Sequence, residues 1–231
     1  MAVNMMLPPP NKQKLHSSSH LPMEYSLDIQ LRNVLPIIQN RIMKQTTWFG
    51  EKSLKNPLDF WVYQEIIYEQ RPDIILEIGN RYGGTTLAFA HLLDLLGKGR
   101  VIGVDIQHDN IGKKTRDHPR ISLIEGDACE KFPLIMENID GNEKILIIED
   151  SSHTYQNTLN VLKTYRDLIP VGGYFIVEDS ICHHGLDIGP APGPYEAVET
   201  FISEDDRFII DRSRESFMIT WNPKGFLKRV R

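Results

Sequence analysis

Three carboxylates and one imidazole lie at the ends of two apolar stretches in this 231-residue chain. Asp150 follows the stretch 145–149, His153 comes three residues later, and Glu178 and Asp179 end a second apolar stretch. Acids that repel one another in one place favour a bound cation. Helix capping explains one such acid easily and three poorly. Because oxygen ligands suit Mg²⁺, with Mn²⁺ or Ca²⁺ as alternatives, the pattern predicts that Asp150, Glu178 and Asp179 bind Mg²⁺.

His153 is the predicted general base beside these acids. The unperturbed pKa of histidine, ~6.5, lets an imidazole take up a proton near neutral pH. A single histidine is more often a surface or packing residue, so this prediction depends on the neighbouring metal site. His183 and His184, in the turn-rich loop 181–194, are alternative bases. We expect this loop, including Pro192, to contact the acceptor substrate because it follows the metal-binding acids directly.

A glycine-rich turn follows the apolar stretch 74–78 and precedes a predicted helix. Glycine lets a ligand approach the backbone, and a helix N-terminus favours polar or anionic groups. The spacing G-x-x-x-G-G differs from the dinucleotide-binding pattern G-x-G-x-x-G. The cofactor-binding residues predicted here are Glu77, Gly79, Gly83, Gly84 and Thr85.

Asp105 and Asp127 follow the next two apolar stretches along the chain. An acid at the end of the second strand commonly binds ribose hydroxyls, and Asp127 is placed to meet an adenine amino group. Taken singly, the glycines are explained as turn formers and the acids as helix caps. Their order along one sheet edge favours a nucleoside cofactor, and we expect Asp150 to complete its site.

The elements that must position these residues alternate between strands and helices. The first five predicted strands are 74–78, 100–105, 121–125, 145–149 and 174–178. Strands joined by a helix run parallel, so their carboxyl ends reach the same edge of the sheet. The last two predicted strands, 207–211 and 216–221, have a short link and should pair antiparallel. The sequence thus predicts an α/β fold, a doubly wound seven-stranded sheet that ends in an antiparallel pair.

We expect three regions along the chain: a flexible arm at 1–22, a helical segment at 23–55 and the main α/β domain at 56–231. The arm is rich in Pro, Ser and His, and the helical segment has apolar residues at helical spacing. Pro36 predicts either two short helices or one bent helix there. The N-terminal helices would suit contacts in a homo-oligomer. The basic C-terminus, 224–231, is expected to be a solvated tail.

Composition excludes several classes of function. The net charge is −5 and no basic stripe is present, which argues against a nucleic-acid partner. Only two cysteines occur, neither in a C-x-x-C pair, which predicts a reducing cytoplasm rather than a disulfide framework. The N-terminus lacks the features of a signal peptide, and no apolar run approaches the ~18 residues of a membrane span.

The whole pattern resembles the family of rhamnosyl O-methyltransferases and cephalosporin hydroxylases, which are class I S-adenosylmethionine (SAM)-dependent, Mg²⁺-dependent enzymes. The matching motifs, over about residues 46–221, are Thr47-Trp48-Phe49-Gly50, Lys55-x-Pro57-x-Asp59, Glu77-x-Gly79-x-x-x-Gly83-Gly84, Asp150-x-x-His153 and Glu178-Asp179. The resemblance implies that Asp105 binds the cofactor ribose, that the three acids bind Mg²⁺ and that His153 deprotonates an acceptor hydroxyl. One departure is Thr85, where Ser is common; either hydroxyl can cap the helix.

We therefore expect a SAM- and Mg²⁺-dependent O-methyltransferase of natural-product or antibiotic biosynthesis, acting on a hydroxyl of a small natural product or a sugar. The acceptor class follows from the resemblance alone. Two alternatives remain open. One is an NAD-type oxidoreductase, against which the glycine spacing and the terminal antiparallel pair weigh; the other is a non-catalytic accessory protein. Because the ferrous-oxygenase pattern His-x-Asp does not occur, hydroxylase activity is not expected.

Overall fold

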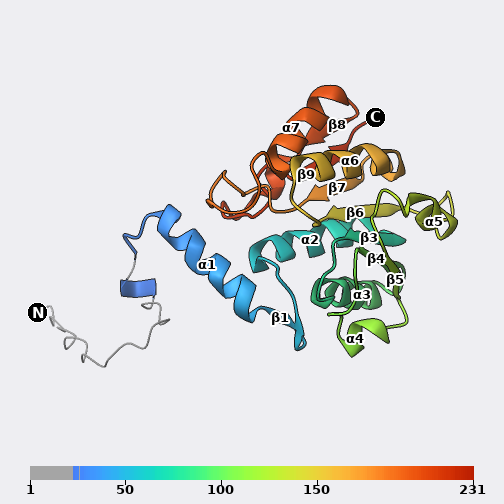
Figure 1. The fold of residues 1–231 in the computed structure, drawn as a ribbon, viewed down its shortest axis with the longest axis horizontal. Coiled ribbons are helices and arrows are strands. Elements are labelled where there is room, and N and C mark those ends of the chain that lie inside the picture. Colours follow the sequence, from blue (N-terminus) through green and yellow to red (C-terminus); the bar gives the residue numbers. More distant parts are fainter. Residues whose placement is uncertain (1–22, 26) are drawn as a thin grey trace, which may run out of the picture.

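A seven-stranded sheet forms the centre of the computed structural model, which describes residues 23–25 and 27–231 (Figure 1). Its strands are β3 Ile74–Ile78, β4 Arg100–Asp105, β5 Ile121–Glu125, β6 Ile145–Glu149, β7 Tyr174–Val177, β8 Phe208–Ile210 and β9 Phe226–Arg229. Their order across the sheet is β5-β4-β3-β6-β7-β9-β8. The strands β3 to β7 run parallel, and β9 lies antiparallel between β7 and β8. The predicted doubly wound α/β fold is confirmed.

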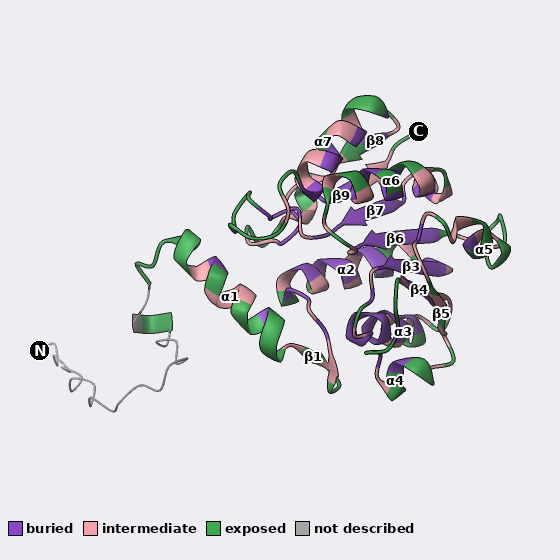
Figure 2. Cartoon of the chain, viewed as in Figure 1, coloured by how far each residue is buried: buried purple, intermediate pink, exposed green. Residues whose placement is uncertain are grey.

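Helices cover both faces of this sheet, so the strands between them are buried (Figure 2). The larger helices are α2 Pro57–Gln70, α3 Gly84–Leu96, α5 Phe132–Glu137, α6 Tyr155–Tyr165 and α7 Pro194–Glu204. Successive strand residues point to opposite faces. Leu76 therefore packs in one core cluster with α5, α6 and α7, and Ile75 packs in another with α2 and α3. This burial on both faces explains why the parallel strands are continuous apolar runs.

Shorter elements connect and extend this framework. They are the 3₁₀ helices η1 Met23–Tyr25, η2 Arg166–Leu168 and η3 Arg212–Arg214, the helix α4 Lys113–Arg116, and the strands β1 Thr47–Trp48 and β2 Glu51–Lys52. The strands β1 and β2 form a separate antiparallel hairpin. A Cβ atom on Gly84 would lie 2.3 Å from the carbonyl oxygen of Lys52, so the absence of a side chain there lets the hairpin cross the start of α3.

Local sequence signals set the ends of α2 and α3. The side chain of Asn56 accepts a hydrogen bond from the Leu58 backbone N–H at 3.2 Å, and Pro57 is the first helical residue of α2. The helix α3 begins after Gly83 (φ 76°) and ends before Gly97 (φ 74°). Both residues adopt the left-handed conformation that favours glycine. Asn56 and the glycine-rich turn consequently come to the carboxyl edge of the sheet.

The helix α1, Leu31–Gln45, extends away from the sheet and is exposed over most of its surface (Figure 2). It is a single helix that contains Pro36, and the separate η1 precedes it. Its buried residues Leu35 and Ile42 pack with Trp221 and with the loop between β7 and α7. One face of α1 therefore covers loops at the carboxyl edge of the sheet.

The prediction of a strand at 216–221 is wrong, although the last two strands do pair antiparallel. The Thr220 hydroxyl and the Trp221 backbone N–H both donate to Asp59, at 2.5 and 2.8 Å, which holds this segment against the start of α2. The tail predicted at 224–231 contains β9 instead. The strand buries Phe226 and its neighbour Leu227 on opposite faces of the sheet, and the basic residues around them obscured this pattern.

The predicted arm at 1–22 lies outside the described residues, and the boundary between 23–55 and 56–231 stays a prediction. Among the helices that the structure describes, none combines the length and the apolar character needed to cross a bilayer.

Replacing Phe226 with Ala should lower the free energy of unfolding by about 3–5 kcal/mol, because the side chain is fully buried between helices and sheet. Urea denaturation measures the change. The matched control is Phe217→Ala, at a side chain 44% exposed in the wrongly predicted strand, which should change stability by less than about 0.5 kcal/mol. Equal losses in the two variants would contradict the assignment of β9.

Candidate active site

A cavity of about 640 Å³ opens at the carboxyl edge of the sheet. This volume lies within the ~300–1,000 Å³ typical of small-molecule sites. Nine of the predicted site residues line it: Glu77, Gly79, Gly84, Thr85, Asp105, Asp127, Asp150, His153 and Asp179. Five others do not line it: Gly83, Glu178, His183, His184 and Pro192. The topology has therefore brought the glycine-rich turn and the strand-end acids into one space.

The glycine-rich turn is shaped by close backbone contacts. A Cβ atom on Gly79 (φ 88°) would lie 2.1 Å from the carbonyl oxygen of Asp150, so glycine lets the ends of β3 and β6 pass closely. Asn80, in the same turn, is 5% exposed, and both polar atoms of its amide lack a hydrogen-bond partner among the described residues. Buried polar atoms without partners are uncommon, and a polar ligand in the cavity would satisfy them.

The acids beside the turn make local hydrogen bonds. Asp105 accepts from the Arg81 backbone N–H at 2.7 Å, and Asp127 accepts from two backbone N–H groups that follow it. Both acids thus hold the backbone of turns, and both still line the cavity. Glu77 is buried and accepts from the Thr86 hydroxyl, and burial raises its pKa to about 7. Binding of the cofactor by these residues stays a prediction.

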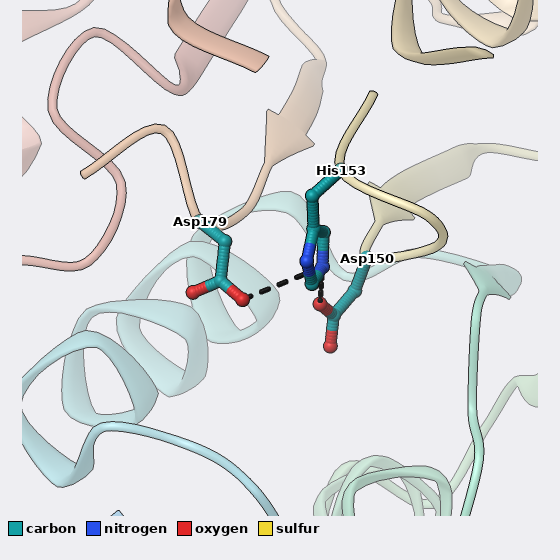
Figure 3. A group of neighbouring side chains, drawn as sticks. All are labelled: Asp150, His153 and Asp179. Carbon is teal, nitrogen blue, oxygen red and sulfur yellow. Dashed lines mark hydrogen bonds and ion pairs between the residues drawn. The ribbon is translucent and has the colours of Figure 1, made fainter. Parts of the chain in front are cut away.

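Asp150, His153 and Asp179 form one group (Figure 3). The His153 Nε2 atom lies 3.0 Å from Asp150 Oδ1 and 3.3 Å from Asp179 Oδ2. One ligand atom from each of the three residues lies within 4.8 Å of the others, as a metal ion requires. His153 (φ 56°) and Asp179 (φ 54°) adopt left-handed backbone conformations that are uncommon for residues other than glycine. Such conformations concentrate at functional sites.

Charge and burial shift the pKa values of this group. Burial alone would lower the pKa of His153, but the carboxylates of Asp150 and Asp179 raise it to about 9. Burial raises the pKa of Asp179 to about 6, although His153 opposes the rise. Burial also acts to raise the pKa of Asp150, and there the positive charges of Lys55 and His153 prevail and lower it. The imidazole is therefore protonated near neutral pH when no metal is bound.

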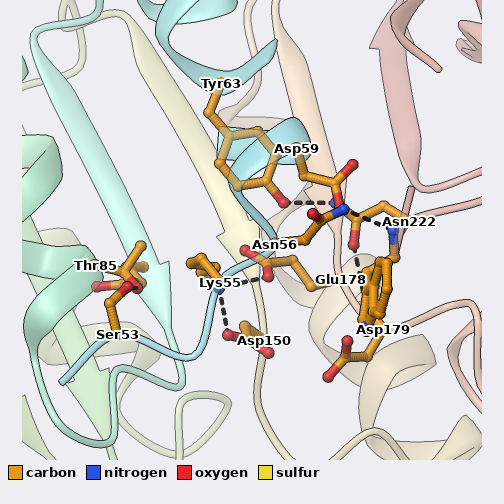
Figure 4. Close-up of polar contacts among 12 residues, drawn as sticks. Ser53, Lys55, Asn56, Asp59, Tyr63, Thr85, Asp150, Glu178, Asp179 and Asn222 are labelled. Carbon is orange, nitrogen blue, oxygen red and sulfur yellow. Dashed lines mark hydrogen bonds and ion pairs between the residues drawn. The ribbon is translucent and has the colours of Figure 1, made fainter. Parts of the chain in front are cut away.

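Glu178, predicted as a third metal ligand, lies outside the group of Asp150, His153 and Asp179. Its Oε2 atom forms an ion pair with Lys55, whose ammonium also lies 2.5 Å from Asp150 Oδ2 (Figure 4). Burial would lower the pKa of Lys55, but the facing carboxylates raise it above its ordinary value. Burial and Asp150 raise the pKa of Glu178 while Lys55 opposes the rise. Because two carboxylate oxygens face the ammonium, we take Lys55 as charged.

Lys55 is the main site residue that the sequence analysis missed. Lys55 belongs to the motif Lys55-x-Pro57-x-Asp59, but the motif alone does not indicate a role for the lysine. A lysine distant in sequence from the acids gives no signal of its own, since Lys is mostly an exposed residue.

The part of the cavity lining that comes from α1 and the C-terminal loop was also missed. It is formed in part by Gln39, Ile42 and Met43 of α1, together with Ile188 and Trp221. The Trp221 indole N–H donates to Gln39 Oε1 at 2.6 Å and joins α1 to the C-terminal loop. Helical apolar spacing did indicate that α1 has a buried face, but spacing cannot say what the face covers.

The loop after β7 contributes to the cavity through other residues than those predicted. His183 contacts Asp187 at 2.9 Å, and the His184 ring stacks on Tyr195 and contacts Glu196 at 2.7 Å. Neither histidine contacts Asp150, His153 or Asp179 in the described structure. Cys182, Ile188 and Gly189 line the cavity in their place.

Comparisons with known proteins identify the family. The family model described as "Rhamnosyl O-methyltransferase/CmcI" matches residues 40–230. The rhamnosyl O-methyltransferase of Mycobacterium tuberculosis (strain H37Rv) is 36% identical over 199 residues, covering 82% of this chain and 80% of the relative. The chain belongs to the rhamnosyl O-methyltransferase/CmcI family. The Mycobacterium leprae relative is 37% identical over 200 residues, covering 82% of this chain and 86% of its own length.

A solved structure of CmcI, described as holding Mg and SAM, is similar in fold to this member of the family. It has a TM-score of 0.65 and 23% sequence identity, and the match covers 97% of this chain and 90% of that chain. The predicted family, the class I methyltransferase fold and the enzyme class, a SAM-dependent O-methyltransferase, are confirmed. The match decides against the NAD-type oxidoreductase.

Proposed function

We propose that this member of the rhamnosyl O-methyltransferase/CmcI family methylates a hydroxyl group of a sugar or of a small natural product, using SAM and Mg²⁺. The observation that carries the proposal is the convergence of Asp150, His153 and Asp179 in the same cavity as the glycine-rich turn. The rhamnosyl O-methyltransferases among the relatives and the CmcI structure described with Mg and SAM support it.

The residues present fit both bound groups. Carboxylate oxygens suit Mg²⁺, and Mn²⁺ or Ca²⁺ would suit them as well. Asp150 and Asp179 would hold the cation, and Glu178 would join them through its buried Oε1 atom, which lacks a hydrogen-bond partner among the described residues. Asn80 offers a buried amide to the cofactor in the same way. When bound, SAM supplies a methyl group and the cation lowers the pKa of an acceptor hydroxyl.

The other cavity residues would orient the cofactor. Gly79 and Gly84 let the turn pack closely against the end of β6 and the β1–β2 hairpin, and the N-terminus of α3 faces the same cavity. Asp105 and Asp127 present carboxylates to the ribose and the adenine. Glu77 accepts a hydrogen bond from the Thr86 hydroxyl, which joins the end of β3 to the start of α3 on either side of the turn.

His153 takes the proton of the acceptor hydroxyl in this proposal. An imidazole is a base only when it is neutral, and the adjacent carboxylates hold the pKa of His153 at about 9 in the metal-free protein. A cation bound to the carboxylates of Asp150 and Asp179 would offset most of their negative charge. The pKa of His153 would then return toward its ordinary value. The base and the metal site are therefore coupled through the same two carboxylates.

The acceptor would lie against the wall that α1 and the loop after β7 provide. Ile42, Met43, Ile188 and Trp221 make this wall largely apolar, while Gln39 adds a polar group. An acceptor that fits has a hydroxyl-bearing ring directed to the acids and an apolar part directed to α1. Biosynthesis of a natural product such as an antibiotic is consistent with this acceptor class.

Assembly and location are further parts of the proposal. Leu31 at the start of α1, with Leu27 and Ile29 before it, is apolar and exposed, which favours contact with a second copy of the chain. Cys129 and Cys182 are both free thiols, as expected in a reducing cytoplasm. Light scattering on the full chain measures the assembly, and a monomer at micromolar concentration would contradict it.

Removing the metal is expected to stop turnover without preventing cofactor binding. EDTA or Asp179→Asn should lower kcat by roughly 100-fold or more, because a divalent cation is worth several kcal/mol of charge stabilisation. Mass spectrometry with SAM and a panel of alkyl and aryl glycosides gives the activity, and calorimetry gives the affinity for S-adenosylhomocysteine.

The control for the acid is Asp187→Asn, at a side chain 98% exposed in the neighbouring loop, which should keep wild-type activity. Full activity in EDTA would show that the metal has no catalytic role.

Replacing His153 with Asn should lower kcat by roughly 10²–10⁴-fold if the imidazole is the general base. His184→Asn is the matched control, since His184 lies in the loop and contacts Glu196 instead of the acids. It should retain kcat within about threefold. If His184→Asn lowers kcat in this way and His153→Asn does not, His184 is the base.

A further inference from the structure

The ammonium of Lys55 lies among the acids at the ends of β6 and β7 (Figure 4). Its Nζ atom is 2.5 Å from Asp150 Oδ2 and also forms an ion pair with Glu178 Oε2. The lysine side chain is 6% exposed. Burying an unpaired charge is costly, and here the buried ammonium is paired with two carboxylates.

The segment that carries Lys55 is fixed on both sides. The Ser53 hydroxyl lies 2.9 Å from the Thr85 hydroxyl at the start of α3. Asn56 caps α2, and its side-chain amide donates to Asp59 at 2.8 Å. These contacts hold the backbone of Lys55 beside the acids.

The ammonium and a divalent cation can share the same carboxylates. Lys55 contacts Oδ2 of Asp150, whereas Oδ1 of that residue faces His153. It contacts Oε2 of Glu178, whereas Oε1 is buried and lacks a hydrogen-bond partner among the described residues. One oxygen of each acid is therefore held by the lysine. The other oxygen of Glu178 is left for a metal, and a bound cation would share the other oxygen of Asp150 with His153.

From this arrangement we infer that Lys55 is a built-in counter-cation, a positioning residue that keeps the acids together in the metal-free protein and limits their affinity for the divalent cation. Like charges a few ångströms apart repel strongly in a buried site. The ammonium relieves this repulsion among the acids, and for the same reason it repels a bound metal. Because it carries two positive charges, a divalent cation is repelled by the Lys55 ammonium about twice as strongly as a proton at the same place. This inference rests on the proposed metal site.

Lys55→Met tests it, because methionine keeps the apolar length of the side chain and removes the charge. Full-length protein is dialysed against EDTA, and free Mn²⁺ is measured by electron paramagnetic resonance during titration with MnCl₂. The Kd for Mn²⁺ should fall by roughly tenfold or more. The rise in Tm between EDTA and saturating Mn²⁺ should also be larger than in the wild type, because tighter binding stabilises the folded state further.

Two controls accompany the variant. Lys55→Arg keeps the charge and should keep the wild-type Kd within about threefold. Lys163→Met removes a lysine that pairs with Glu204 at the surface and should change neither measurement. If Lys55→Met folds only with Mn²⁺ present, the inference is supported. If it folds under neither condition, Lys55→Gln takes its place in the same titration.

Other results overturn the inference. If Lys55 has only a structural role, the Tm of Lys55→Met should fall equally with and without Mn²⁺, and its Kd for Mn²⁺ should not change. A lysine that only orients the ligands predicts weaker Mn²⁺ binding in Lys55→Met. If the wild-type protein itself binds no Mn²⁺, the proposed metal site fails, which the wild-type titration separates from a failure of the inference alone.

Discussion

Parallel strands bring their carboxyl ends to one edge of a sheet, and here the ends of β6 and β7 carry acids. Burial raises the energy of each carboxylate, and their closeness raises it further. Positively charged side chains offset this cost. His153 lies between Asp150 and Asp179, and Lys55 lies between Asp150 and Glu178. Most other features of the site depend on this balance of charge.

The balance also gives the site its chemistry. Asp150, whose pKa the nearby cations lower, offers a carboxylate to a metal ion. The carboxylates of Asp150 and Asp179 raise the pKa of His153, so a cation bound by the same acids would lower it again. The glycine-rich turn lines the same cavity.

The sequence predicted much of the fold because burial on both faces leaves a clear signal. The strands β3, β4, β5 and β6 have the predicted bounds, since each is an apolar run between turn residues. The error at β9 has a physical cause. Ser216–Trp221 has strand-like composition but is held by Asp59, whereas β9 has two apolar residues beside basic ones. Tertiary contacts decided between two segments of similar propensity.

The candidate site could be predicted where its residues come from strand ends, and not elsewhere. Chain order and topology were enough to bring Asp150, His153 and Asp179 together. Lys55 reaches the acids from a segment before α2, and the wall of α1 reaches the cavity across a long separation in sequence. Neither has a motif with a mechanism of its own, because such contacts depend on how a connecting segment folds over the edge of the sheet.

The most direct measurement is anomalous diffraction at the manganese edge, from crystals grown with MnCl₂ and S-adenosylhomocysteine. The account predicts one strong peak within ~2.0–2.3 Å of carboxylate oxygens of Asp150 and Asp179, on the side of these acids away from Lys55. It also predicts that the peak lies in the cavity that holds the cofactor. A peak elsewhere, or none at these acids with the cofactor product bound, would show that Asp150 and Asp179 do not form the metal site.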